Sequence, residues 1–229
     1  MKKRKELDSK HFQLAILGWI AILLAPLVWL CSFLHGFDFP QSISETGTMA
    51  NTVSSLLPIA LGALAIFSGT YGYKYSYDYI WDKVLPYIMC AGFLFVAFYP
   101  TASPYVYQEF VGPFPVTPEV SHTIHLIGAL AGFGALIAWI LVCFTKSDPS
   151  IEQTKQKFYR NLIYFIMGGF ILVCLPILIL SMTDQLNPHF ALVFWLEAII
   201  LFGAGISCLV KSGLITPLRD RCEEVEENE

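Results

Sequence analysis

Three segments of the chain contain no lysine or arginine: 36–50, 100–120 and 183–189. All 14 basic residues lie elsewhere. Along the chain, segments with basic residues and segments without them alternate, and an apolar stretch separates each from the next. Loops on the cytoplasmic side of a membrane carry an excess of Lys and Arg, so the pattern excludes the three segments from that side. It predicts that both termini are cytoplasmic.

Charged residues of either sign are scarce. They make up 14% of the chain, against 55% hydrophobic residues, which is typical of a polytopic membrane protein and leaves no room for a soluble domain. A helix needs about 20 apolar residues to cross a hydrocarbon core of about 30 Å. We therefore predict an all-α fold, a bundle of six transmembrane helices. The helices are expected at about 12–35, 51–73, 84–99, 121–144, 160–182 and 190–211, between a basic cytoplasmic arm at 1–11 and an acidic cytoplasmic tail at 212–229. The third stretch is short, so its helix should borrow residues from 79–82 or cross at a tilt.

Cysteine is absent from the expected outer loops. Five of the six cysteines lie in apolar stretches and the sixth, Cys222, lies in the tail. Because none is placed where oxidation could link it, we expect free thiols that act as small hydrophobic residues. The outer face is poor in charge, which suits a bacterial cytoplasmic membrane. Membrane lipid is the expected partner, and no nucleic-acid partner is expected.

Glycines mark the expected helix contacts. Gly128 and Gly132 form a Gly-x-x-x-Gly pair in the fourth helix, a spacing that lets two backbones approach closely in lipid. His122 and His125 are three residues apart and share a helical face, which continues along this small-residue face. The packing face therefore places His125 at the outer end of the bundle interior.

Four of the five histidines lie at the outer level: His35, His122, His125 and His189. Two neutral imidazoles three residues apart could supply two ligands to a zinc ion, with His189 or a carboxylate completing an open site. Alternatively, they form hydrogen bonds to carbonyl groups at a helix start, or contribute to a polar ligand site. We expect no cofactor, with zinc as the alternative.

Glu197 is the most diagnostic single residue. It lies about 10–12 Å along the sixth helix, at about 1.5 Å per residue. A carboxylate at that depth costs on the order of 2–3 kcal/mol, so it should face the bundle interior and find a polar partner or a proton. We expect that partner in the fourth helix or in the turn at 42–48. The Ser- and Thr-rich turn at 40–48 is the other polar feature, since its side chains can bond to its own backbone. Within it, Glu45 could reach the histidines or lie in water.

The turn also carries a resemblance. Its string Phe39-Pro40-Gln41-Ser42-Ile43-Ser44-Glu45-Thr46-Gly47-Thr48 resembles the turn after the first helix in the damage-regulated autophagy modulator family, which groups with GPI-lipid-remodelling membrane proteins. The sequence His125-Leu126-Ile127-Gly128-Ala129 resembles the opening of that family's fourth helix, and Glu197 matches an acidic residue in its last helix. Gln41 and the position of Trp195 depart from the family pattern.

A second resemblance covers more of the chain. Tyr99-Pro100-Thr101, Phe144-Thr145-Lys146-Ser147 and Phe194-Trp195-Leu196-Glu197-Ala198 are similar to segments of bacterial six-helix membrane proteins of unknown function. Both resemblances imply the same six-span architecture, and neither implies a catalytic activity.

These observations predict a polar pocket in the outer half of the membrane. Its candidate ligand-binding residues are Ser44, Glu45, His122, His125 and Glu197. The expected role is to bind or handle a lipid headgroup or a small polar ligand, with no catalytic residue assigned. One alternative is a metal-dependent hydrolase acting on lipid, with His122, His125 and His189 as ligands. The other is a proton-coupled carrier in which Glu197 titrates.

Overall fold

The described part of the chain is helical. The computed structural model describes residues 2–36, 38–48, 52–75, 79–101, 109–146, 154–182 and 191–218. Within these ranges the α-helices are α1 (Lys2–Leu34), α2 (Thr52–Tyr75), α3 (Ile80–Phe98), α4 (Pro118–Ala138), α5 (Lys155–Met182) and α6 (Leu192–Lys211). The same ranges contain no strand, only an isolated bridge between Val111 and Val116. The all-α class is confirmed.

Five of these helices are long and apolar enough to cross a membrane. The spans are Ser9–Leu34, Ile80–Phe98, Pro118–Phe144, Lys155–Ser181 and Leu192–Lys211, and α2 contributes a shorter apolar stretch, Leu57–Tyr73. These are the helices of an integral membrane protein. The third helix begins at Ile80, inside the segment from which it was expected to borrow residues. The basic N-terminal residues belong to α1 rather than to a separate arm.

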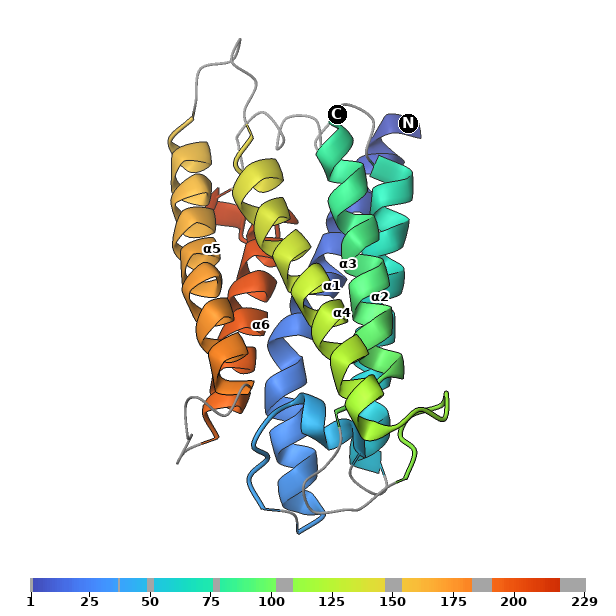
Figure 1. The fold of residues 1–229 in the computed structure, drawn as a ribbon. Coiled ribbons are helices and arrows are strands. Elements are labelled where there is room, and N and C mark those ends of the chain that lie inside the picture. Colours follow the sequence, from blue (N-terminus) through green and yellow to red (C-terminus); the bar gives the residue numbers. More distant parts are fainter. Residues whose placement is uncertain are drawn as a thin grey trace.

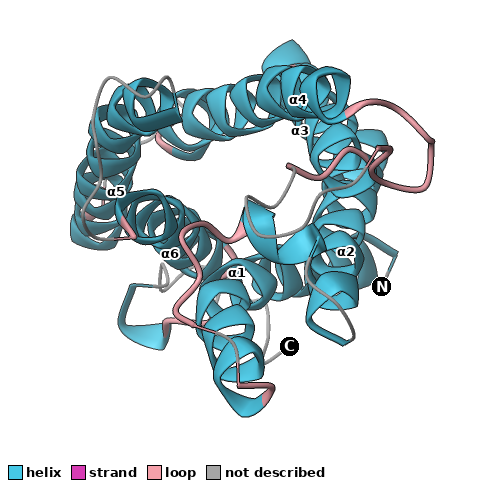
Figure 2. Ribbon diagram, turned by 60° about the horizontal axis from the view of Figure 1, so that its bottom comes forward, coloured by secondary structure: helices cyan, strands magenta, loops and turns pink. Residues whose placement is uncertain are grey.

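The helices form an incomplete ring. Each of α2, α3 and α4 packs on the helix before it, α6 packs on both α1 and α5, and α4 contacts α5 only weakly. Figure 2 shows the helices around the bundle axis, with the segment after α1 crossing one end of the opening. The N-terminus, the start of α5 and the end of α6 lie at the other end, uppermost in Figure 1. We call this the basic end, because Lys10, Lys157 and Lys211 lie there.

Glycines make a close contact between α3 and α4, on the face that the sequence predicted. Gly92 of α3 lies against Gly128 and Gly132 of α4, where an added Cβ would come within 2.6 Å of the Gly128 carbonyl oxygen and of the Gly132 nitrogen. No larger residue fits between these backbones, and close packing of this kind holds helices together in lipid. This α3–α4 contact sets the position of the first half of α4.

The apolar pattern predicts a regular helix over 121–144. In the structure the α-helix α4 ends at Ala138 and a different helical turn follows it. Residues Trp139–Phe144 form a π-helical segment, η2. Residues five apart lie about 140° apart around an α-helix, so Trp139 and Phe144 could not both face inward on one. The wider π turn lets both be fully buried, with ring centroids 4.7 Å apart.

Candidate functional site

The segment after α1 folds into a compact turn that ends in the 3-10 helix η1 (Ser44–Thr48). The Gln41 N–H donates to Glu45 Oε2 at 3.1 Å, and the Glu45 N–H donates to Ser42 Oγ at 2.9 Å. The Thr46 hydroxyl donates to the Ile43 carbonyl oxygen at 2.6 Å. The prediction that side chains of this turn bond to its own backbone is confirmed.

This turn is fixed to the start of α6. The Phe194 N–H donates to the Gln41 carbonyl oxygen at 2.9 Å. The Phe39 ring packs against Phe194 and Trp195, with centroid distances of 4.9 Å and 5.9 Å. The turn therefore bridges α1 and α6 across one end of the bundle.

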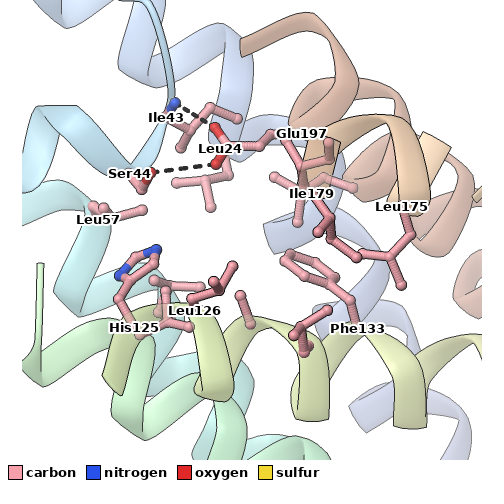
Figure 3. Close-up of a pocket in the computed structure, with 16 residues that line it drawn as sticks. Leu24, Ile43, Ser44, Leu57, His125, Leu126, Phe133, Leu175, Ile179 and Glu197 are labelled. Carbon is pink, nitrogen blue, oxygen red and sulfur yellow. Dashed lines mark hydrogen bonds between the residues drawn. The ribbon is translucent and has the colours of Figure 1, made fainter. Parts of the chain in front are cut away.

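Glu197 faces the bundle interior. Its residue is 8% exposed, and Oε2 accepts the Ile43 N–H at 2.5 Å while Oε1 accepts the Ser44 hydroxyl at 3.3 Å (Figure 3). A carboxyl group has about four lone-pair positions, so these two bonds leave acceptor capacity. The expected inward direction is confirmed, and its partner is the turn rather than α4.

His125 approaches the same region from α4. It is 2% exposed, and its Nδ1 lies 2.8 Å from the Tyr99 carbonyl oxygen at the end of α3. One turn earlier, the Ser121 hydroxyl donates to the Pro100 carbonyl oxygen at 2.7 Å. A carbonyl oxygen can only accept, so Nδ1 carries the proton, and Nε2 of the neutral ring is an acceptor.

Ser44, His125 and Glu197 line one cavity, which we call the outer pocket. Its volume is about 40 Å³, enough for a water molecule or a small polar group. Figure 3 shows His125 across the cavity from Ser44 and Glu197. The rest of the lining is apolar, and between α4 and α5 it is formed by residues that are partly exposed. These are Leu126, Leu130, Leu175 and Ile179.

The structure separates the other predicted site residues from this pocket. Glu45 is buried, and its carboxylate accepts the Gln41 N–H, but the residue does not line the pocket. Burial raises the pKa of Glu45 above its usual 4.5, and hydrogen bonds from the Gln41 and Ser42 backbone oppose that rise. His122 is half-buried and does not line the pocket, whereas His35 is exposed and bonds to the Cys31 carbonyl oxygen of its own helix.

A three-histidine metal site needs His189, which lies outside the described residues. Among the residues that the structure does describe, no group of three or more His, Cys, Asp and Glu side chains could hold a metal ion. His125 nevertheless has the arrangement usual for a metal-ligating histidine, with one nitrogen bonded to a carbonyl and the other available.

Sequence reasoning missed two kinds of contributor. The strongest donor to Glu197 is the backbone N–H of Ile43, which no side-chain pattern reveals. The leucines of α5 that line the pocket look like any lipid-facing residues in the sequence. The turn at 42–48 was itself predicted as one possible partner of Glu197, because a buried carboxylate needs a donor, but the donating group was not.

The pocket chemistry is that of an acceptor set. The Ser44 hydroxyl donates to Glu197, and its oxygen also lies 3.1 Å from the Ser42 hydroxyl oxygen. The Glu197 carboxyl group and His125 Nε2 offer lone pairs to the pocket, and the Ser44 oxygen has one lone pair left beside its bond to Ser42. Such a set can receive a hydroxyl or an amine, and a phosphate group would meet acceptors only.

Comparisons with known proteins found no matching family model, curated protein or solved structure.

Proposed function

We propose that the protein is an integral membrane protein that binds a lipid through the outer pocket. The lipid places a hydroxyl- or amine-bearing polar group on Ser44, His125 and Glu197. One acyl chain lies along the apolar side of the pocket between α4 and α5. The convergence of these three side chains in an otherwise apolar cavity carries this proposal.

The gap between α4 and α5 supports a lipid over a soluble ligand. Helix α4 is held by α3 through glycines and contacts α5 only weakly, so the pocket wall on this side consists of leucine and isoleucine side chains rather than a helix contact. A molecule that enters between α4 and α5 contacts apolar side chains first and reaches the hydrogen-bond acceptors of the pocket last. A lipid has its polar and apolar parts in that arrangement.

The proposal includes six spans, with both termini in the cytoplasm. Helix α2 is the sixth span, and the basic end is the cytoplasmic one, since Lys and Arg concentrate on that side of membranes. The turn that holds Glu197 then lies toward the outer face. The location in a bacterial cytoplasmic membrane and a relationship to the damage-regulated autophagy modulator family stay predictions.

Mass spectrometry of lipids that co-purify with the full-length protein tests this function. Wild-type protein should retain a lipid class with a hydroxyl or amine headgroup at close to one molecule per chain. Ser44→Ala should lower that retention by about threefold, the effect of one lost neutral hydrogen bond. Glu197→Gln should lower it by about tenfold if the group is an amine, because a charge-assisted bond is about twice as strong.

Ser207→Ala is the matched control. Ser207 is a buried serine of α6 that bonds to the Gly203 carbonyl oxygen of its own helix and does not line the pocket. It should retain lipid as the wild type does. Equal retention in the wild type, Ser44→Ala and Glu197→Gln would contradict the proposed function.

A metal-dependent hydrolase is the second candidate, favoured by the bond between His125 Nδ1 and the Tyr99 carbonyl oxygen. It requires His122 and His189 to bring nitrogens to about 2.0–2.1 Å from one zinc ion. Metal analysis of purified protein decides it: about one zinc per chain, lost in His125→Ala and in His189→Ala, would favour the hydrolase over simple lipid binding.

A further inference from the structure

A second polar cavity lies at the basic end of the bundle, opposite the outer pocket. Its volume is about 200 Å³, many times the roughly 10–15 Å³ that one water needs. We call it the inner pocket. Lys10, Lys157, Arg160 and Lys211 line it, together with Tyr164. Among the described residues that line the cavity none is acidic, and the nearest carboxylate that acts on Lys211 is that of Asp82 in α3.

Tyr164 borders this cavity and has a buried hydroxyl group. The side chain is fully buried, and its ring packs on Phe144 with a centroid distance of 5.4 Å. The hydroxyl has no hydrogen-bond partner among the described residues. A buried polar group without a partner costs stability, so a ligand in the adjoining cavity that reached this hydroxyl would gain a hydrogen bond.

Three of the four cationic groups form hydrogen bonds to backbone carbonyl oxygens. Lys157 Nζ donates to the Phe144 and Lys146 oxygens at 3.1 Å and 3.0 Å, and Lys211 Nζ lies 3.4 Å from the same Phe144 oxygen. Arg160 Nη1 donates to the Leu218 oxygen at 2.7 Å. Two ammonium groups that share one carbonyl oxygen repel each other, and an anion between them would offset that repulsion.

Helix polarity adds to the same field. Lys157 and Arg160 lie in the first turns of α5, where the helix dipole disfavours cations and favours anions. A general preference for basic residues on the cytoplasmic side does not explain this arrangement. That preference would be met by any basic residue at this end of the bundle. Three lysines there are exposed and do not line the pocket: Lys83, Lys146 and Lys155.

We propose that the inner pocket binds a phosphate-bearing anion. Lysine ammonium groups and the arginine guanidinium contact its oxygens, and the Tyr164 hydroxyl donates one further hydrogen bond. An anionic lipid headgroup and a soluble phosphate share this chemistry. The site is separate from the outer pocket and does not depend on it.

Binding titrations on the full-length protein, in nanodiscs of phosphatidylcholine, test this site. The probes are inorganic phosphate and dihexanoyl phosphatidate, a short-chain lipid with a phosphate headgroup. Both should bind saturably and compete with each other. Lys157→Gln and Lys211→Gln should weaken binding at least tenfold, and Tyr164→Phe at least threefold, whereas Lys155→Gln and Lys83→Gln should stay within twofold of wild type.

The two probes also identify the source of the anion. Binding of phosphatidate without phosphate assigns the pocket to a lipid headgroup, and binding of phosphate alone assigns it to a soluble anion. Saturable binding of neither probe would overturn the proposal, as would an equal loss in Lys155→Gln and Lys157→Gln. If the lysine variants fail to fold, Tyr164→Phe decides, because it keeps the ring packing, and wild-type affinity in that variant would overturn the proposal.

Discussion

The two ends of the bundle hold pockets of opposite chemistry. The outer pocket presents acceptors, with Ser44, His125 and Glu197 set in an apolar wall. The inner pocket presents donors, with three lysines, an arginine and a tyrosine hydroxyl around a larger space. The polar groups of the outer pocket are fixed by bonds to a turn and to a helix end, and the cations of the inner pocket by bonds to carbonyl oxygens.

The difference shows how a membrane bundle places polar groups at two depths. Glu197 lies within a span, so it needs donors from the protein itself, and the 40–48 turn folds back to supply them. In the inner pocket Lys157 lies near the start of α5 and Lys211 at the end of α6, so these cations are not set in the middle of a span. A ligand of the outer pocket should therefore be mostly apolar, and a ligand of the inner pocket mostly charged.

The largest effect is expected at the α3–α4 contact, which holds His125 in the outer pocket. In Gly92→Ala the added Cβ would meet backbone atoms at 2.6 Å, so the helices must move apart. We expect the free energy of unfolding in detergent to fall by about 3 kcal/mol, the upper end of the range for overpacking.

Gly134→Ala is the control for this change. Its added Cβ would meet nothing within 4 Å, and alanine favours a helix over glycine by about 0.5–1 kcal/mol, so the unfolding temperature should equal or slightly exceed that of the wild type. Equal unfolding temperatures for Gly92→Ala and wild type would show that the two helices are not in close contact.

Glu197→Leu should produce the next largest effect, confined to the outer pocket. Leucine leaves the buried Ile43 N–H without its acceptor, which costs about 1–3 kcal/mol of stability, whereas Glu197→Gln keeps an acceptor and should cost less than about 1 kcal/mol. Chemical unfolding of both variants measures the difference. Phosphate binding at the inner pocket should be unchanged in both, and its loss in Glu197→Gln would show that the two pockets are coupled.

How far the sequence predicted this architecture depends on the kind of interaction. Apolar runs and glycine spacing predicted the helices and the Gly128–Gly132 face, because both follow from packing in lipid. The inward direction of Glu197 was predictable from the cost of a buried charge. The backbone partners of Glu197 and His125, which are the Ile43 N–H and the Tyr99 carbonyl oxygen, could not be predicted. Such partners depend on how segments far apart in the sequence meet in the fold.

The inner pocket shows the other limit of the sequence. Its lysines were visible as members of basic segments, and they were interpreted only as markers of topology. Lys10, Lys157 and Lys211 are far apart along the chain, and only the packing of α1, α5 and α6 brings them to one cavity. The π-helical end of α4, which presents the Phe144 carbonyl oxygen to two of them, had no signal in the apolar pattern.

Ligand binding at the two pockets should depend differently on ionic strength. The Debye length falls from about 30 Å at 0.01 M to about 3 Å at 1 M ionic strength, so phosphate binding at the inner pocket should weaken several-fold over this range. Lipid retention in the outer pocket rests on buried bonds and apolar contact and should change by less than twofold. Measuring both at the two ionic strengths checks this, and an outer pocket as salt-sensitive as the inner one would contradict the assignment.

The smallest expected effect concerns pH. Because burial raises the pKa of Glu45, the folded protein holds this proton to higher pH than the unfolded chain does. Stability therefore falls as the pH rises from the usual 4.5 of a glutamate through the folded-state pKa. Glu45→Gln removes the titration and should flatten that part of the curve of unfolding temperature against pH. Identical curves for the two proteins would show that Glu45 titrates alike in both states.

The most direct test of two pockets with opposite chemistry is a crossed binding experiment by native mass spectrometry. Wild type, Ser44→Ala and Lys157→Gln are each offered diacylglycerol, a lipid with a free hydroxyl and no charge, and dihexanoyl phosphatidate. The account predicts that Ser44→Ala loses affinity for diacylglycerol alone and that Lys157→Gln loses affinity for phosphatidate alone. The account would be contradicted if either variant lost affinity for both lipids. It would also be contradicted if both variants bound both lipids as the wild type does.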